Sequence, residues 1–168
     1  MPKIIENLEA NLIEEARKQI SEQGYAATTI RSVARGCGVG VGTVYNYFPS
    51  KEALIANLLL GDWRNCIAAI EASAAQSDLP EPVVQCICHQ LQIFVSKYQT
   101  IFHDETATAG FSGSFRRYHS LLRNQLSQPI RKFCHSDFQA DFIAEALLTW
   151  TCSGTTFDEL YGMIDKLF

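Results

Sequence analysis

The chain has 168 residues and a formal net charge of −4, a length that suits one or two compact domains with a buried core. A negative charge argues against nucleic-acid binding only where it is spread evenly. Residues 23–51 contain Arg31, Arg35 and Lys51 and no acidic residue, whereas residues 61–168 hold 8 basic and 12 acidic residues. This composition excludes a broadly basic, nonspecific nucleic-acid binder and allows localised DNA contact through few phosphates.

The first third of the chain predicts a helix followed by a helix-turn-helix. Apolar side chains recur at positions 8, 12, 16 and 20, which favours an amphipathic helix over residues 5–23 that ends at Gly24. The next stretch, TTIRSVARGCGVGVGTVYNYFPSK at residues 28–51, has the apolar spacing of two short helices that meet at a sharp angle. Gly38 lies where the turn needs a positive φ, and the second short helix is expected over residues 40–47.

Capping residues define the predicted ends of these helices. Thr28 and Thr29 are the N-cap candidates for the first short helix, and Ser50 is the candidate for the helix that begins at Lys51. Gly36 falls inside the first short helix, an unusual choice because glycine lowers helix stability. The run GCGVGVG lacks the Gly-Lys-Ser/Thr ending of a phosphate-binding loop and follows a helix, so that interpretation is rejected.

A long helix is predicted over residues 51–75, with Gly61 at a point where the helix can bend and leave one core for another. Residues 74–82 are expected to form a loop, with Pro82 in the first turn of the next helix. That helix extends to about residue 103.

The remaining pattern is also helical. Residues 104–114 predict a glycine-bearing loop and a candidate lid, and Pro129 is expected to kink or end the helix that follows. Ser136 or Asp137 caps a helix that runs to about residue 152, and Thr156 has the capping-box spacing to Glu159 for a final helix. No strand pattern competes with these helices, and the last two are apolar enough to need a partner beyond their own domain.

The string TTIRSVARGCGVGVGTVYNYFPSKEAL, preceded by a helix that ends in Gly24-Tyr25, resembles the N-terminal domain of the TetR family of bacterial transcriptional regulators. The resemblance covers residues 5–60. It implies an all-α fold with an N-terminal three-helix helix-turn-helix domain at residues 1–50. A small C-terminal helical ligand-binding and dimerisation domain would follow at residues 51–168, of which residues 51–60 pack on the first domain.

The resemblance also implies partners. It predicts a homodimer formed through the last two helices, at about residues 137–153 and 156–168, and a palindromic operator in double-stranded DNA. It further predicts a small-molecule effector that releases the DNA. No cofactor is implied.

Side chains in and around the two short helices are expected to contact DNA. Tyr45 and Tyr47 can bury a ring edge and present a hydroxyl to phosphate, and a phosphate would explain Lys51 at a helix start. Arg31 either reaches DNA or forms a salt bridge with the first helix. The expected DNA-binding residues are Thr28, Thr29, Arg31, Gly40, Val41, Gly42, Thr43, Tyr45, Asn46, Tyr47 and Lys51.

Base reading is expected to be apolar or sparse. Where the family commonly has a polar pair at the start of the recognition helix, this sequence has Gly40-Val41. Val41 can touch a thymine methyl group, and the glycines on either side of it leave the backbone close to base edges.

Rings and a few polar groups in the C-terminal half have the chemistry of an apolar pocket, so the effector is expected to be apolar or aromatic. Each ring also has the helical spacing of a core residue. The candidate ligand-binding residues are Phe94, Tyr98, Phe102, Phe115, Tyr118, His119 and Trp150.

No metal site or catalytic site is predicted. Cys86 and Cys88 point away from each other on a helix, and a tetrahedral zinc site beside His89 would need four ligands. The six cysteines, without a signal peptide, are expected to be reduced and buried, with a redox-sensing thiol as the alternative. No stretch approaches the roughly 20 apolar residues of a membrane span, so we expect a cytoplasmic protein with no membrane contact.

We therefore predict a sequence-specific DNA-binding transcriptional regulator, a ligand-released repressor that acts as a homodimer on a palindromic operator, and not an enzyme. The alternative is a helical small-molecule-binding protein of the same fold with weak or lost DNA binding. Gly40-Val41 and the small number of basic residues favour that alternative.

Overall fold

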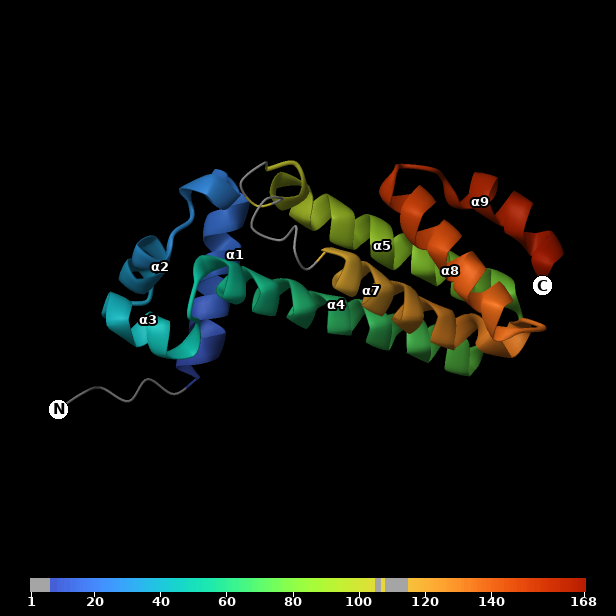
Figure 1. Ribbon diagram of the computed structural model, residues 1–168, viewed down its shortest axis with the longest axis horizontal. Coiled ribbons are helices and arrows are strands. Elements are labelled where there is room, and N and C mark those ends of the chain that lie inside the picture. Colours follow the sequence, from blue (N-terminus) through green and yellow to red (C-terminus); the bar gives the residue numbers. More distant parts are fainter. Residues whose placement is uncertain (1–6, 105–106, 108–114) are drawn as a thin grey trace. The chain divides into compact units, whose positions relative to one another are not determined.

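The computed structural model describes residues 7–104, Ala107 and 115–168, with side chains described from His119 onward in the last range. All regular structure in these ranges is helical (Figure 1), which confirms the predicted all-α fold. The chain divides into two compact units. The first comprises Met1–Asp62 and Gln99–Ser112, and the second comprises Trp63–Tyr98 and Gly113–Phe168.

The first unit contains α1 (Leu8–Ala27), α2 (Ile30–Gly36), α3 (Val41–Tyr47) and the first part of α4 (Lys51–Gln76). α2 contacts both α1 and α3. The apolar stripes of these helices face a common core, as their helical spacing predicts. The buried core side chains include Leu12, Ala16, Ile20, Val33, Val44, Phe48, Leu54, Ile55 and Leu58.

Turn and capping residues give these short helices defined ends. Gly24 has φ +82 and Gly38 has φ +66, a region that L side chains rarely adopt, so both glycines stand where the chain must break or turn. Thr29 is the N-cap of α2: its hydroxyl accepts a hydrogen bond from the Ser32 N–H (3.0 Å), and the Ser32 hydroxyl accepts one from the Thr29 N–H (2.9 Å). The Ser50 hydroxyl caps α4 as predicted.

The second unit contains the rest of α4, α5 (Pro80–Phe102) as far as Tyr98, α7 (Phe115–Ile130), α8 (Asp137–Cys152) and α9 (Phe157–Ile164). Short 3-10 turns follow α7 and α9. α7 and α8 lie side by side (Figure 1). Side chains buried in the core of this unit include Trp63, Ile67, Ile70, Val83, Ile87, Leu91, Leu126, Ile130, Ile143, Leu147 and Leu160.

Most helix boundaries agree with the sequence, with one clear correction. The predicted loop at residues 74–82 is shorter, because α4 continues to Gln76 and α5 begins at Pro80. Proline has no N–H to leave unpaired and a helix-compatible φ, so Pro80 also suits the first turn of a helix. Of the predicted loop at residues 104–114, all but Asp104 and Ala107 lie outside the described residues.

The caps of the last helices are confirmed. α7 ends one residue after Pro129, Ser136 caps α8, and Thr156 forms a capping box with Glu159 at the start of α9. Each cap satisfies N–H groups that have no partner within their own helix.

α4 is long and apolar enough to cross a membrane by length and composition alone, which the sequence interpretation did not expect. The core helix of a soluble protein passes the same test. The helix continues through Gly61, and the boundary between the two units follows directly, between Asp62 and Trp63. Its buried side chains therefore serve two cores, Leu54 and Leu58 in one unit and Trp63 and Ile70 in the other.

Candidate nucleic-acid interface

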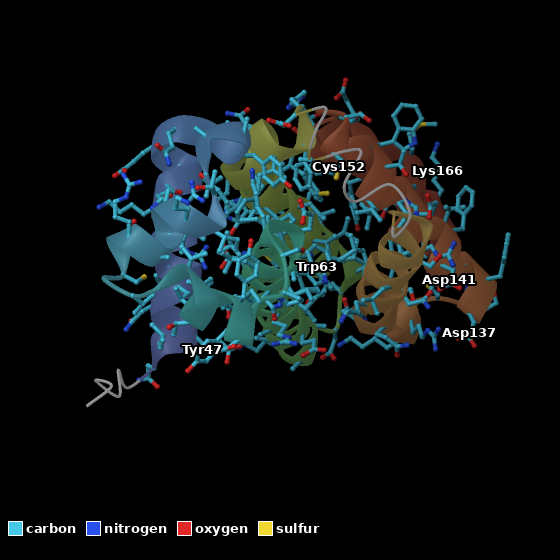
Figure 2. The ribbon with its side chains drawn as sticks, turned by 60° about the vertical axis from the view of Figure 1, so that its left-hand side comes forward. Tyr47, Trp63, Asp137, Asp141, Cys152 and Lys166 are labelled. Carbon is cyan, nitrogen blue, oxygen red and sulfur yellow. The ribbon has the colours of Figure 1, made fainter. Side chains whose placement is uncertain are left out.

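α3 has one buried and one exposed face. Val44 is fully buried and holds the helix against the first unit. Gly42, Tyr45 and Asn46 are exposed and follow one another at i, i+3 and i+4, so they share the opposite face. Tyr45 and the neighbouring Tyr47 keep 52% and 46% of their surface exposed, and Tyr47 is labelled in Figure 2. The outer face of α3 thus presents the Tyr45 phenol and the Asn46 amide, and the Tyr47 phenol is exposed at the flank of the helix, three residues from Val44.

The first turn of α3 is poor in side chains. Its N-cap is Gly40, which gives no side-chain cap, and Val41 and Thr43 are half-buried. A Cβ added to Gly42 would meet no atom within 4 Å, so the fold itself does not require glycine there. The backbone at Gly42 is open to any partner that approaches this face.

Arg31 and Lys51, the two cations predicted for the interface, and the neighbouring Arg35 have different surroundings. Arg31 and Arg35 on α2 are exposed, and within the described residues neither has an ion pair, so the alternative pairing of Arg31 with the first helix is not observed. The Lys51 ammonium is half-buried: it donates to the Tyr25 carbonyl oxygen and lies 3.6 Å from the centroid of the Tyr25 ring. Burial lowers the pKa of Lys51, while Asp104 and Glu52 oppose that shift.

The two predicted threonines also differ. Thr28 is 1% exposed, and its hydroxyl donates to the Gly24 carbonyl oxygen at 2.9 Å. It therefore closes the end of α1 in this conformation. Thr29 is exposed, although its hydroxyl is occupied by the cap of α2.

A polar network that sequence reasoning missed holds α2 against α1. The Ser32 hydroxyl donates to Gln19 Oε1 (2.6 Å), and Gln19 Nε2 donates to Glu15 Oε1 (2.7 Å). The Glu15 side chain lies against the Cα of Gly36, where an added Cβ would overlap it. This contact explains the glycine inside α2. In sequence, the only available signal was the helical i, i+4 spacing of Glu15 and Gln19.

In the second unit, three aromatic rings form a cluster. Phe94 makes edge contacts with Trp63 (centroids 5.5 Å apart) and Tyr98 (5.1 Å). The Trp63 indole N–H donates to Gln125 Oε1 at 2.7 Å, and Figure 2 labels Trp63 among the helices. Sequence reasoning named Phe94 and Tyr98 as ligand-binding candidates but missed Trp63.

The other predicted ligand-binding residues differ in exposure and in the unit to which they belong. Phe102 is 46% exposed and belongs to the first unit, and Trp150 is 56% exposed on α8. His119 Nε2 lies 3.4 Å from Glu145 Oε1. The side chains of Phe115 and Tyr118 lie outside the described residues. The contact between the Phe94 and Tyr98 rings supports a shared site for these two candidates, and the ligand-binding role of the set stays a prediction.

α8 and α9 carry large exposed apolar side chains. Phe138, Phe142 and Trp150 on α8 are 79%, 54% and 56% exposed, and Met163 on α9 is 78% exposed. Phe138, Phe142 and Trp150 recur at helical spacing and share one side of α8. Isolated exposed apolar residues are ordinary, but several large ones on one helix side mark a surface that another molecule can cover.

Burial keeps several of the cysteine thiols in their less reactive form. Burial raises the pKa of the Cys86, Cys88 and Cys134 thiols, and the Thr151 hydroxyl lies 3.6 Å from Cys88 Sγ. A raised pKa keeps a thiol protonated and slow to react. Across the described residues, no group of three His, Cys, Asp or Glu side chains could hold a metal ion.

Comparison with known proteins agrees with this geometry. Residues 12–58 match the family model described as bacterial regulatory proteins, tetR family. Over 114 residues the chain is 38% identical to the HTH-type transcriptional repressor KstR2 of Mycobacterium tuberculosis, a match that covers 67% of this chain and 53% of that protein. The chain thus spans about half of this relative's length, and only 16% of a second relative's.

Solved structures share the fold. A putative transcriptional regulator from Streptomyces coelicolor superposes with a TM-score of 0.72 and 13% identity, over 94% of this chain and 96% of that one. A transcriptional regulator from Aquifex aeolicus does so with a TM-score of 0.67 and 16% identity, over 95% and 99%. By its matched helix-turn-helix and its fold, the chain belongs to the TetR family of bacterial regulatory proteins.

Proposed function

We propose that this protein is a sequence-specific DNA-binding transcriptional regulator, and the exposed face of α3 is the observation that carries the proposal. Tyr45 and Asn46 project from this face, and the exposed guanidinium groups of Arg31 and Arg35 belong to the adjacent α2. Such a helix enters the major groove while the arginines neutralise backbone phosphates.

The proposed contacts divide into two classes. Thr29, Arg31, Tyr45 and Tyr47 position the protein on the DNA backbone, because hydroxyl and guanidinium groups donate to phosphate oxygens. Base edges are read by the first turn of α3 and by Asn46, whose amide can pair with adenine. The proposed base-reading residues are Gly40, Val41, Gly42, Thr43 and Asn46.

We propose a homodimer that covers the apolar side of α8 together with α9. Phe142, Trp150 and Met163 would be buried in such an interface, which needs about 1,000 Å² or more of buried surface to be stable. In a two-fold dimer the α3 helices enter successive major grooves roughly 34 to 36 Å apart. The operator is therefore palindromic.

In this proposal residues 1–50 recognise DNA, and residues 51–168 bind an effector and dimerise, with residues 51–60 packed on the first domain. The effector is a small apolar or aromatic molecule, for which the rings of Phe94 and Tyr98 are the most favourable candidates in the described part. Binding of the effector releases the DNA, so the protein acts as a repressor in the cytoplasm. The name of the KstR2 relative, a repressor, supports this sign of regulation.

One observation favours a second candidate function. The first turn of α3 offers Gly40, Val41 and Gly42 to the bases, which is little for side-chain readout. The alternative is a helical small-molecule-binding protein of the same fold with weak or lost DNA binding.

Selection of fragments from genomic DNA by the purified protein tests both candidates and names the operator. Arg31→Ala and Tyr47→Ala are each expected to weaken binding to the selected fragment about a hundredfold, because a dimer loses one charge-assisted hydrogen bond, worth about tenfold, from each subunit. Arg64→Ala is the matched control, because Arg64 is exposed in the second unit. Failure of the wild-type protein to enrich any fragment would support the alternative.

A further inference from the structure

Lys51 makes two contacts with one buried residue. Its ammonium donates to the Tyr25 carbonyl oxygen and lies over the Tyr25 ring, 3.6 Å from the centroid. Tyr25 is 3% exposed and directly follows the break in α1 at Gly24. A cation is favourable here for two reasons: it satisfies the carbonyl end of a helix, and it gains cation–π attraction from a ring shielded from water.

The next residue of α4, Glu52, acts electrostatically on the same side chain. Burial, followed by the negative charges of Glu52 and Asp104, raises the pKa of Tyr25 to about 12, so the hydroxyl stays a donor. The first turn of α4 therefore contacts Tyr25 at its backbone and its ring through Lys51.

The two residues of this contact lie on either side of the helix-turn-helix segment. Tyr25 and Lys51 are 26 residues apart, and the segment between them contains α2, the turn at Gly38 and α3. The contact thus joins the two ends of the helix-turn-helix segment. An ammonium that reached for a phosphate would have to leave the carbonyl and the ring, whereas the exposed Arg31 would give up no ion pair.

We propose that Lys51 is a positioning residue that holds the helix-turn-helix segment closed through Tyr25, and that it does not contact a DNA phosphate. The role rests on the proposed DNA-binding function, since it concerns how α3 is presented to the groove. It departs from the interpretation of Lys51 as a phosphate ligand, which followed from its place at a helix start alone.

The salt dependence of DNA binding separates the two roles. A lost phosphate contact lowers the slope of log affinity against log salt concentration by about 0.9 for each subunit. For Lys51→Met we expect an unchanged slope with affinity reduced by the same factor at every salt concentration. Arg31→Met is the comparison variant and should lower the slope. A reduced slope for Lys51→Met would overturn the proposal.

A mutant cycle in the free protein tests the contact without DNA. Lys51→Met, Tyr25→Leu and the double variant are compared by amide exchange of α2 and α3, with Tyr25→Phe as a control that keeps the ring. We expect the two substitutions to be coupled by about twofold to thirtyfold in the opening constant, the range of a cation–π contact. Because Tyr25→Phe keeps the ring, Lys51→Met and Tyr25→Phe should show little coupling. Additive effects of Lys51→Met and Tyr25→Leu would refute the positioning role.

The two experiments also distinguish an error in the proposed function from an error in the proposed role of Lys51. If the wild-type protein binds no DNA, the proposed function is wrong, and the amide-exchange cycle still decides whether Lys51 closes the segment. If DNA binds and the cycle shows no coupling, only the role of Lys51 is wrong.

Discussion

Gly36 and Gly42 are both helical, yet their surroundings are opposite. A Cβ on Gly36 would overlap the Glu15 side chain, whereas a Cβ on Gly42 would meet no atom within 4 Å. Glu15 is not free to swing away without cost, because its carboxylate accepts the Gln19 amide that in turn accepts the Ser32 hydroxyl. Gly36 is therefore explained by packing within the fold, whereas the surface at Gly42 is open to a partner molecule.

This difference predicts opposite signs for the same substitution. Gly36→Ala should lower the free energy of unfolding by about 1 kcal/mol. Displacement of Glu15 loses a hydrogen bond to a charged group, worth about 2 kcal/mol, and the helix preference of alanine offsets about half of that loss. Gly42→Ala should raise it by about 1 kcal/mol, the helix preference of alanine over glycine. Urea titration monitored by circular dichroism measures both. A destabilised Gly42→Ala variant would contradict the open environment assigned to that position.

At the scale of helices, two lysines donate hydrogen bonds to carbonyl oxygens at the C-terminal ends of helices. Lys51 serves α1, and Lys132 serves α4: its ammonium donates to the carbonyl oxygens of Ala74 (2.6 Å) and Ser77 (2.5 Å). The last carbonyls of a helix have no partner within it. An ammonium at this end also opposes the helix dipole.

Removal of the second of these contacts should loosen the end of α4. Lys132→Met is expected to lower the free energy of unfolding by about 1 kcal/mol, the value of a charge-assisted hydrogen bond discounted for exposure. Lys166→Met serves as the control, because Lys166 is also exposed and changes the net charge equally. Equal melting temperatures for the two variants would show that the Lys132 contacts add no stability.

The apolar side of α8 gives a prediction about assembly. Phe142→Glu should convert a dimer into monomers in analytical ultracentrifugation, because a carboxylate buried without a partner costs several kcal/mol. Leu79→Glu is the matched control, since Leu79 is 65% exposed between α4 and α5. Dimerisation unaffected by Phe142→Glu would place the interface elsewhere.

Sequence patterns predicted the positions of these helices in the chain better than they predicted the contacts that the helices make. Periodicity and capping residues located α1, α2, α3 and the Thr156 capping box, because each signal is local in the chain. The partner of Lys51 lies 26 residues away, and no local rule pairs an ammonium with that carbonyl. The sequence could not group the ligand-binding candidates into one site for a related reason: helical spacing places a ring on a face but does not say which helix the face meets.

For the whole molecule, the distribution of charge decides how DNA binding responds to salt. The body of the chain is acidic, with 8 basic and 12 acidic residues over 61–168. In the helix-turn-helix segment, Lys51 is engaged with Tyr25, which leaves Arg31 and Arg35 as exposed cations on α2. Under the proposed function, affinity therefore comes from few phosphate contacts, supplemented by the uncharged donors Tyr45 and Tyr47.

This distribution predicts a shallow salt dependence. With two arginines on each subunit, a dimer neutralises about four phosphates, so the slope of log affinity against log salt concentration should be about −4. Fluorescence anisotropy with the selected operator at several salt concentrations measures it. Replacing both Arg31 and Arg35 by Met should remove most of the slope, whereas Arg64→Met should leave it unchanged. A wild-type slope near −8 would require about twice as many phosphate contacts as the arginines provide. Other cations would then have to contact phosphates, and Lys51 would be the first candidate.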